Sequence, residues 1–142
     1  MENIIDVGSG GGMPGIPTAI CRPDIQITLL DSNSKKTSFL SQAVIELGLS
    51  NVKVITGRVE AAEGITFDAI TSRAFAELRD FVTLTPQLLG ENGRWLAMKG
   101  VHPYEEIAQL PEDVHVTQVD KLNVPSLEAE RHMVIIQKGA AA

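Results

Sequence analysis

The chain has 142 residues, of which 44% are hydrophobic and 21% charged, a composition typical of one folded globular domain and not of a disordered or fibrous chain. Its apolar runs are far shorter than the ~18 residues that cross a bilayer, and the start Met1-Glu2-Asn3 has no signal-like pattern, so we expect a cytoplasmic protein without membrane contact. The formal net charge of -6 excludes a uniformly basic surface, so any nucleic-acid site must be local.

Short apolar segments alternate with longer amphipathic ones along the first two thirds of the chain. The apolar segments predict strands, and several are nearly all apolar, as strands buried on both faces should be. Between them, the sequence predicts helices over 34–47 and 77–89, the first ended by Gly48. The predicted strands are 4–7, 26–30, 52–56, 67–71 and 95–98, and the predicted apolar stripe of the first helix is Phe39, Leu40, Ala43, Val44 and Leu47.

Two further strands are predicted near 115–122 and 131–138, joined by a proline-containing loop. A connection without a helix favours a hairpin, so the last strand should run antiparallel to the others. Alternation of strands and helices before it is typical of a parallel α/β sheet. The prediction is therefore an α/β, Rossmann-like fold with a mostly parallel sheet and an antiparallel terminal strand, in one domain over residues 1–138 followed by a tail at 139–142.

A glycine-rich segment follows the first predicted strand. Gly8, Gly10, Gly11, Gly12 and Gly15 lie within eight residues, more glycine than a simple strand-to-helix turn needs. Glycine lets the backbone approach a ligand closely and adopt positive φ. In an open parallel sheet, ligands bind beyond the carboxyl ends of the strands, where this segment lies. The pattern predicts a nucleotide-type ligand at this loop.

Two classes of ligand fit the loop. Gly10 to Gly15 matches the dinucleotide pattern G-x-G-x-x-G, and Asp31 stands where a ribose-binding acid is expected, so an NAD(P)-dependent oxidoreductase is one candidate. Asp6 argues against it, because a carboxylate at the strand end would repel a pyrophosphate but suit the cationic end of an aminoacyl ligand. The chain is also short for a dehydrogenase, which usually needs a substrate domain. These points favour S-adenosyl-L-methionine.

With that donor, Asp31 would accept hydrogen bonds from the ribose hydroxyls, and Val59 and Glu60 would flank the adenine. Asp31 has a competing interpretation as a helix N-cap or turn aspartate. Glu60 equally suits the first turn of a helix, where an acid complements the dipole.

Several segments, in order over nearly the whole chain, match one family. They are IIDVGSGGGMPGIP, LLDSNSKKTSFL, GRVE, FDAITSRAFAEL, GRWLAMKG and LEAERHMVII. With these the chain resembles the glucose-inhibited division protein B (RsmG) family, bacterial enzymes that methylate a guanine N7 in 16S ribosomal RNA. The resemblance implies the fold of class I S-adenosylmethionine-dependent methyltransferases, and 16S ribosomal RNA or the small ribosomal subunit as partner.

The same resemblance implies roles for individual residues. Donor contacts are expected at Gly8, Met13, Val59, Glu60 and Arg73, and the glycine pattern adds Gly10. Three basic positions of the family's site region correspond to Arg58, Lys99 and Arg131; we expect Arg73, Lys99 and Arg58 in the catalytic region and Arg131 on the substrate side. Family members also carry a helical segment before the first strand, which these residues do not include, and we expect it to supply basic surface.

Methylation at guanine N7 needs no general base, because N7 presents a lone pair in the neutral base. Orientation of donor and acceptor would supply most of the catalysis. The product base is cationic, so Arg73 and Lys99 are expected to hold the donor carboxylate, a phosphate or the guanine O6. Lys35 and Lys36 oppose the dipole of the helix they begin, which suggests phosphate contact, although a solvated helix face explains them equally well.

Three other interpretations stay open: a methyltransferase with a non-RNA acceptor, the oxidoreductase, and a donor-binding domain without activity. No metal is expected, because no Cys/His cluster exists and the acids are scattered. We expect a monomer. Cys21, the single cysteine, is expected to be a buried, inert thiol, and Trp95 to be a packing residue.

Overall fold

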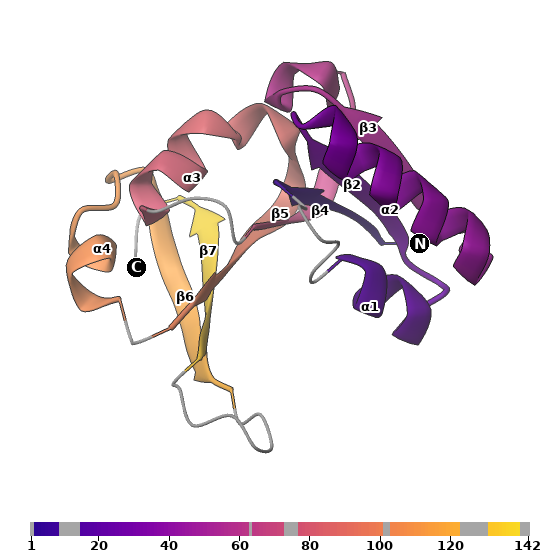
Figure 1. Ribbon diagram of the computed structural model, residues 1–142. Helices are drawn as coiled ribbons and strands as arrows, with labels where there is room; N and C mark the ends of the chain where they lie inside the picture. The colour runs from indigo at the N-terminus through magenta and orange to yellow at the C-terminus, as the bar shows by residue number, and fades with distance from the viewer. Residues whose placement is uncertain are drawn as a thin grey trace.

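The computed structural model describes residues 2–8, 15–62, 64–72, 77–100, 103–122 and 131–139. They form one twisted sheet of seven strands in the order β3-β2-β1-β4-β5-β7-β6 (Figure 1). The strands are β1 (Asn3–Val7), β2 (Gln26–Asp31), β3 (Val52–Thr56), β4 (Phe67–Ser72), β5 (Leu89–Lys99), β6 (Val114–Lys121) and β7 (His132–Lys138). All pairs from β3 to β5 are parallel, and β7 is antiparallel to both β5 and β6.

This arrangement confirms the predicted fold, a Rossmann-like mostly parallel sheet with an antiparallel last strand. The sheet order reverses between β1 and β4, which is the topological switch point of the fold. The terminal hairpin is placed so that β7 lies between β5 and β6. The start of β7 therefore returns to the edge where β1 to β5 end, with His132 opposite both Lys99 and Lys121.

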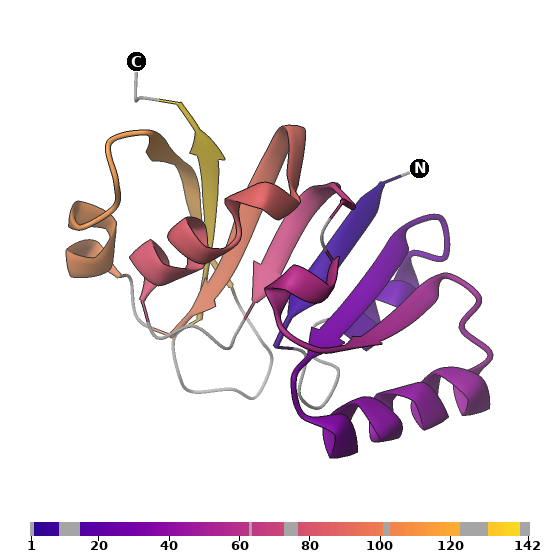
Figure 2. The same ribbon diagram turned by 90° about the horizontal axis from the view of Figure 1, so that it is seen from above.

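Helices cover both faces of the sheet (Figure 2). The α-helices are α1 (Gly15–Cys21), α2 (Ser34–Leu47), α3 (Leu78–Leu84) and α4 (Tyr104–Ala108), and the 3₁₀ helices are η1 (Val59–Ala62) and η2 (Pro86–Leu88). Ala19 of α1 and Leu40 of α2 belong to a small core with buried residues of β2. A larger core on the other face contains Phe81 of α3 and Trp95 of β5. No described helix is long and apolar enough to span a membrane.

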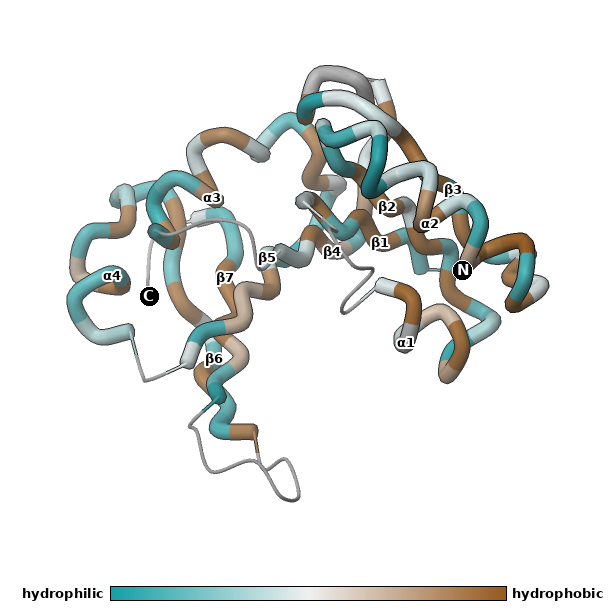
Figure 3. The backbone as a smooth tube through the Cα atoms, in the orientation of Figure 1, coloured by the Kyte–Doolittle hydropathy of each residue, from teal (hydrophilic) through white to brown (hydrophobic). Residues whose placement is uncertain are grey.

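Helix α2 has the bounds predicted from sequence, and its ends explain them. The Asn33 side chain accepts hydrogen bonds from the amides of Lys35 and Lys36 at 3.0 and 3.2 Å, and Gly48 ends the helix at φ 63°. The predicted stripe is too wide, because Phe39 and Leu47 are 59% and 54% exposed while Leu40 is buried. Figure 3 shows α2 changing from hydrophilic at its first turn to hydrophobic near its end.

The predicted helix over 77–89 is shorter than expected. Helix α3 ends at Leu84, because Pro86 has no amide hydrogen to continue it and restricts the residue before it. The chain then forms η2, and Thr85 is buried at the junction. Its hydroxyl accepts a hydrogen bond from the Trp95 indole at 2.9 Å, which confirms Trp95 as a packing residue.

Two other expectations need correction. Strand β5 begins six residues before the predicted 95–98, and it passes through Asn92 at φ 61°, while its pairing with β4 shifts register between Phe67 and Ala69. Cys21 is exposed at the end of α1, so the prediction of a buried thiol is wrong.

Residues at the same level of neighbouring strands define the edge where ligands are expected. Neighbouring strands lie about 4.8 Å apart, so residues of one row on either side of the switch point lie close together. From β3 to β7 the row is Ile55, Leu30, Val7, Ser72, Ala97 and Val134.

Candidate donor-binding site

The glycine-rich connection is anchored at both ends by described residues. At its start, Gly8 follows β1 with φ 72°, a conformation that favours glycine, and its amide donates to the Leu30 carbonyl at 2.7 Å. At its end, the amide of Gly15 donates to the buried Asp6 carboxylate at 3.1 Å. The connection therefore leaves and re-enters the fold at fixed points beside β1.

Gly15 also satisfies a packing requirement. A Cβ at this position would overlap the Leu29 side chain and approach the Asp6 carboxylate oxygen to 3.0 Å. Glycine is needed there so that α1 can begin directly against β2. Asp6 therefore also holds the end of the glycine segment.

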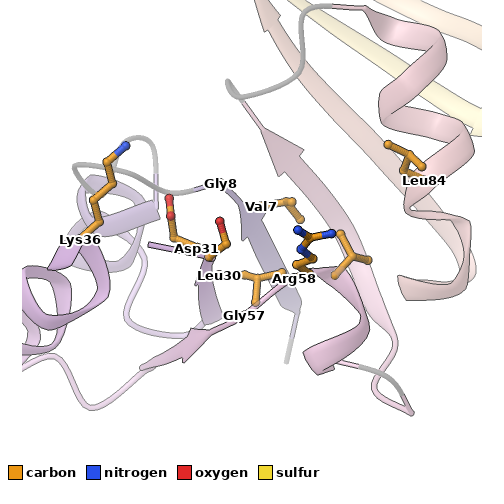
Figure 4. A pocket seen from close by; sticks show the side chains of 10 residues that line it. Val7, Gly8, Leu30, Asp31, Lys36, Gly57, Arg58 and Leu84 are labelled. Atoms are coloured by element: carbon orange, nitrogen blue, oxygen red, sulfur yellow. The ribbon is translucent and has the colours of Figure 1, made fainter. Parts of the chain in front are cut away.

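A cavity of about 520 Å³ opens beside this connection, within the range typical of small-molecule sites. It lies beyond the carboxyl ends of β1, β2 and β3. Figure 4 shows Asp31 and Lys36 toward one end of it and Leu84 toward the other. Its lining residues are Val7, Gly8, Leu30, Asp31, Ser32, Lys36, Gly57, Arg58, Val59 and Leu84.

Asp31 is the acidic residue of this cavity. It ends β2, it is half-buried, and its Oδ1 accepts a hydrogen bond from the Asn33 amide at 2.9 Å. Its backbone carbonyl accepts from the Gly57 amide at 2.9 Å. The N-cap of α2 is Asn33, so Asp31 is not the helix cap, but its bond to the Asn33 amide is that of a turn aspartate, the other competing interpretation. Asp31 therefore presents a fixed carboxylate at the cavity wall.

Residues after β3 and on α3 form the rest of the wall. Arg58 is exposed at the cavity, and Val59 is half-buried and packs against the larger core. Leu84 lines the cavity with an exposed fraction of 56%, an apolar side chain facing open space. The polar and apolar walls together suit a ligand with a ribose-like diol and a flat ring.

A second group of polar residues lies at the same edge, around the end of β5 and the start of β7. The ammonium of Lys99, at the end of β5, is 2.8 Å from the Glu106 carboxylate of α4. The Nδ1 of His132 is 2.8 Å from the Gly100 carbonyl oxygen. Lys99 and Arg131 do not line the cavity, so these two predicted site cations lie apart from Lys36 and Arg58, which do.

One exposed ion pair shifts pKa values elsewhere. The Arg22 guanidinium hydrogen-bonds the Asp24 carboxylate at 2.8 and 3.0 Å, which lowers the pKa of Asp24 and raises that of Arg22. Both residues precede β2, at the edge of the sheet opposite the cavity. In the described ranges, no three His, Cys, Asp or Glu side chains cluster as metal ligands would.

Comparison with known proteins decides the family. The family model for GidB, rRNA small subunit methyltransferase G, matches residues 1–134. The chain belongs to this family. It is 63% identical over 138 residues to ribosomal RNA small subunit methyltransferase G of Neisseria meningitidis serogroup B, covering 97% of the chain and 67% of that relative. With the Chromobacterium violaceum protein of the same name it shares 63% over 132 residues, covering 92% of the chain and 63% of the relative.

The family's relatives are longer than this chain, which spans about two thirds of their length. Solved structures share the fold at low identity. TrmN from Thermus thermophilus superposes with a TM-score of 0.76 at 16% identity, covering 96% of this chain and 44% of that one. A mutant of MtNAS in complex with S-adenosylmethionine gives 0.73 at 17%, covering 97% and 55%. Neither the oxidoreductase nor the non-RNA acceptor gains support from these comparisons.

The structure places several of the predicted site residues together at the cavity and others apart from it. Gly8, Asp31, Val59 and Arg58 come together at the cavity, and Lys36, predicted for RNA, lines it as well. Lys35 is exposed on α2, and Arg131 is half-buried just before β7. Gly10, Met13 and Arg73 lie outside the described residues, and Glu60 lies in η1 without a described side chain.

Two residues at these sites were not predicted from the sequence. The sequence predicts Leu84 within a helix, and only the arrest of α3 at Pro86 places it over the cavity. Glu106 lies in α4, a five-residue helix that no periodicity indicates. The signal for α4 is Pro103 followed by two acids, Glu105 and Glu106, which suit the first turn of a helix.

Proposed function

We propose that this chain is the donor-binding and catalytic domain, over residues 1–138, of an S-adenosyl-L-methionine-dependent methyltransferase that modifies a guanine N7 of 16S ribosomal RNA. The observation that carries the proposal is the cavity at the switch point, with Gly8 and Asp31 on its wall, in a chain of the GidB family. Its partner would be 16S ribosomal RNA or the small ribosomal subunit, met in the cytoplasm by a monomer.

The residues of the cavity fit the donor. Asp31 would accept hydrogen bonds from the ribose hydroxyls, and the backbone at Gly8 allows close approach of the ligand. The adenine would lie against Val59, with Leu84 providing a second apolar surface. Gly10, Met13, Glu60 and Arg73 remain proposed donor contacts on the family's pattern.

The bound donor supplies a methyl group on a sulfonium, and guanine N7 accepts it with its own lone pair. The reaction therefore needs no proton removed from N7, and the chain's residues have to orient the acceptor. Orientation alone can contribute several kcal/mol, up to about 7–11. A guanine in a loop or unstacked region suits this reaction, because side chains cannot read the narrow major groove of an RNA helix.

The acceptor would enter from the β4–β5–β7 side of the edge. Lys99 and Arg131 lie there, and Arg58 follows β3 and lines the donor cavity. Because the methylated base carries positive charge, these cations, with Arg73, would bind phosphate, the donor carboxylate or the guanine O6 and stay off N7. Lys35 and Lys36 extend the positive charge along α2 and would contact RNA phosphates.

Two measurements test this function. Calorimetric titration should give saturable binding of S-adenosyl-L-methionine and no heat with NAD. Tritiated methyl groups should then pass to 16S ribosomal RNA in small subunits from a strain that lacks the modification, and mass spectrometry should find 7-methylguanosine. Donor binding with transfer only to a non-RNA acceptor would overturn the RNA assignment, and NAD binding would overturn the class.

A further inference from the structure

The Glu106 carboxylate joins three elements next to the proposed acceptor side. One oxygen, Oε1, lies 2.8 Å from the Lys99 ammonium and also accepts the Leu78 amide at 3.0 Å. Lys99 ends β5, Leu78 begins α3, and Glu106 lies in α4. One atom thus fixes a cation at the sheet edge and the first residue of a helix.

This contact is sheltered from water. The side chains of Lys99 and Glu106 are 15% and 24% exposed, so their attraction is screened less than that of a surface pair. Exposed pairs usually contribute little to stability, and the Arg22–Asp24 pair, at 58% and 62% exposure, is an example on this chain. The Lys99–Glu106 pair therefore restrains the lysine, whereas the Arg22–Asp24 pair does not restrain either partner comparably.

The start of α3 depends on the same carboxylate. Glu77 occupies the N-cap position of α3, but its side chain makes no capping hydrogen bond. The Leu78 amide is one of the helix donors without an intrahelical acceptor, and Glu106 of α4 supplies that acceptor. In the sequence, α3 directly follows the SRAFAE segment that leaves β4, so Glu106 fixes the point where this family segment ends.

Helix α4, which carries Glu106, packs against the larger core. Ile107, the next residue, packs against the larger core, and its amide donates to the Pro103 carbonyl at 3.0 Å. On the other side of Lys99, His132 holds the carbonyl of Gly100. The lysine is therefore restrained through its side chain and through the backbone that follows it.

We infer that Glu106 is a positioning residue for the acceptor side of the site, holding Lys99 and the start of α3 in the geometry that receives the target guanine. The inference rests on the proposed function, since Lys99 acts there on the RNA. Glu106 does not line the donor cavity, so its loss should affect methyl transfer and leave donor binding intact. A residue needed only for folding would affect both.

Glu106→Gln separates the two contacts of the carboxylate. Glutamine keeps a carbonyl oxygen for the Leu78 amide but removes the charge that holds Lys99. We expect kcat for transfer to the small subunit to fall about tenfold, because a misplaced Lys99 would orient the acceptor less well, with the donor Kd within about twofold of the parent. Glu105→Gln is the matched control, because it removes the same charge from an exposed neighbour in α4, and it should leave both quantities unchanged.

A double variant tests whether Glu106 acts through Lys99. Lys99→Gln with Glu106→Gln should lower kcat no further than Lys99→Gln alone, since coupled residues are not additive. Independent, multiplying losses would overturn the inference. So would an unchanged kcat in Glu106→Gln, or a loss of donor affinity equal to the loss of kcat.

Chemical labelling gives a readout that needs no turnover. Acylation of lysine amines, followed by mass spectrometry, should modify Lys99 several times faster in Glu106→Gln than in the parent, with exposed Lys53 as internal reference. Equal Lys99 rates in the two proteins would refute the positioning role. If the parent transfers no methyl group, the proposed function fails, and the labelling result still decides whether Glu106 holds Lys99.

Discussion

Replacing Asp31 by asparagine should weaken donor binding without unfolding the site. The asparagine side chain keeps an oxygen that can accept the Asn33 amide, now bonded to Asp31 Oδ1 at 2.9 Å, so the entry to α2 is preserved. The substitution removes the negative charge of the carboxylate, which we propose accepts hydrogen bonds from the ribose hydroxyls. Hydrogen bonds to a charged group contribute roughly 1.5–3 kcal/mol. At about 1.4 kcal/mol per tenfold, the donor Kd should rise roughly 10-fold to 100-fold.

Calorimetric titration with S-adenosyl-L-homocysteine measures this effect, and a 2′-deoxyribose analogue identifies its source. The parent should bind the deoxy analogue less tightly than the normal ligand, whereas Asp31→Asn should discriminate much less between the two. A Kd for Asp31→Asn within about twofold of the parent would refute the ribose contact, because the lost hydrogen bonds alone predict a larger change. An equal loss with both ligands would show that the substitution acts on the shape of the cavity. Ser32→Ala, at the next position of the same wall, serves as the control for a local change that leaves the carboxylate in place.

Three further substitutions test other contacts of the fold and site. Gly15→Ala should destabilise the chain by about 1–3 kcal/mol in urea unfolding, because its Cβ would overlap Leu29; unchanged stability would contradict this packing. Thr85→Val should cost about 1–3 kcal/mol by leaving the buried Trp95 indole without its acceptor, and exposed Thr83→Val should not. Lys35→Ala should lower RNA affinity and reduce its salt slope by about 0.7–0.9 per lost phosphate contact, with donor affinity unchanged; an unaltered slope would identify Lys35 as a solvated residue.

The sheet was predictable because its strands carry their own signal. Strands that are buried on both faces must be almost wholly apolar, and an apolar run that includes Ile27, Leu29 and Leu30 therefore indicates a buried strand. Asp31 and Gly8 were predictable for a related reason. Each directly follows such a strand, and parallel strands bring their carboxyl ends to one edge. Local sequence therefore determined the elements and placed Gly8 and Asp31 at the cavity.

What escaped prediction depends on contacts between distant segments. Phe39 and Leu47 have the periodicity of a buried stripe, but α2 lies at the end of the sheet over β2 and β3, where it buries only a narrow face. Strand β5 includes Glu91, Asn92 and Gly93, residues that usually end a strand, and the pairing of Leu89 and Arg94 with β4 on either side of them keeps them within it. Glu106 is 28 residues from Leu78, so no local pattern could join them.

The net charge of -6 conflicts with RNA binding only if no local group of cations is present, and the topology brings several cations to one edge of the sheet. Strands β1 to β6 end at one edge of the sheet, where β7 begins, so residues after each strand share that edge. The basic residues at or near this edge are Lys35, Lys36, Arg58, Lys99, Lys121 and Arg131. Acidic residues at the opposite edge, before or early in the strands, are Glu2, Asp24, Asp68, Glu91, Glu112 and Asp113.

An asymmetric charge distribution of this kind orients an approaching polyanion. RNA phosphates would be attracted to the cations at the edge that carries the cavity, which favours productive encounters. Acidic residues elsewhere on the surface also disfavour unproductive RNA binding away from the cavity. The overall acidity of the chain is thus compatible with an RNA substrate, because the field near the cavity depends on the cations that lie there and not on the net charge of the whole chain. These cations share one edge because a parallel sheet brings together the residues that follow its strands.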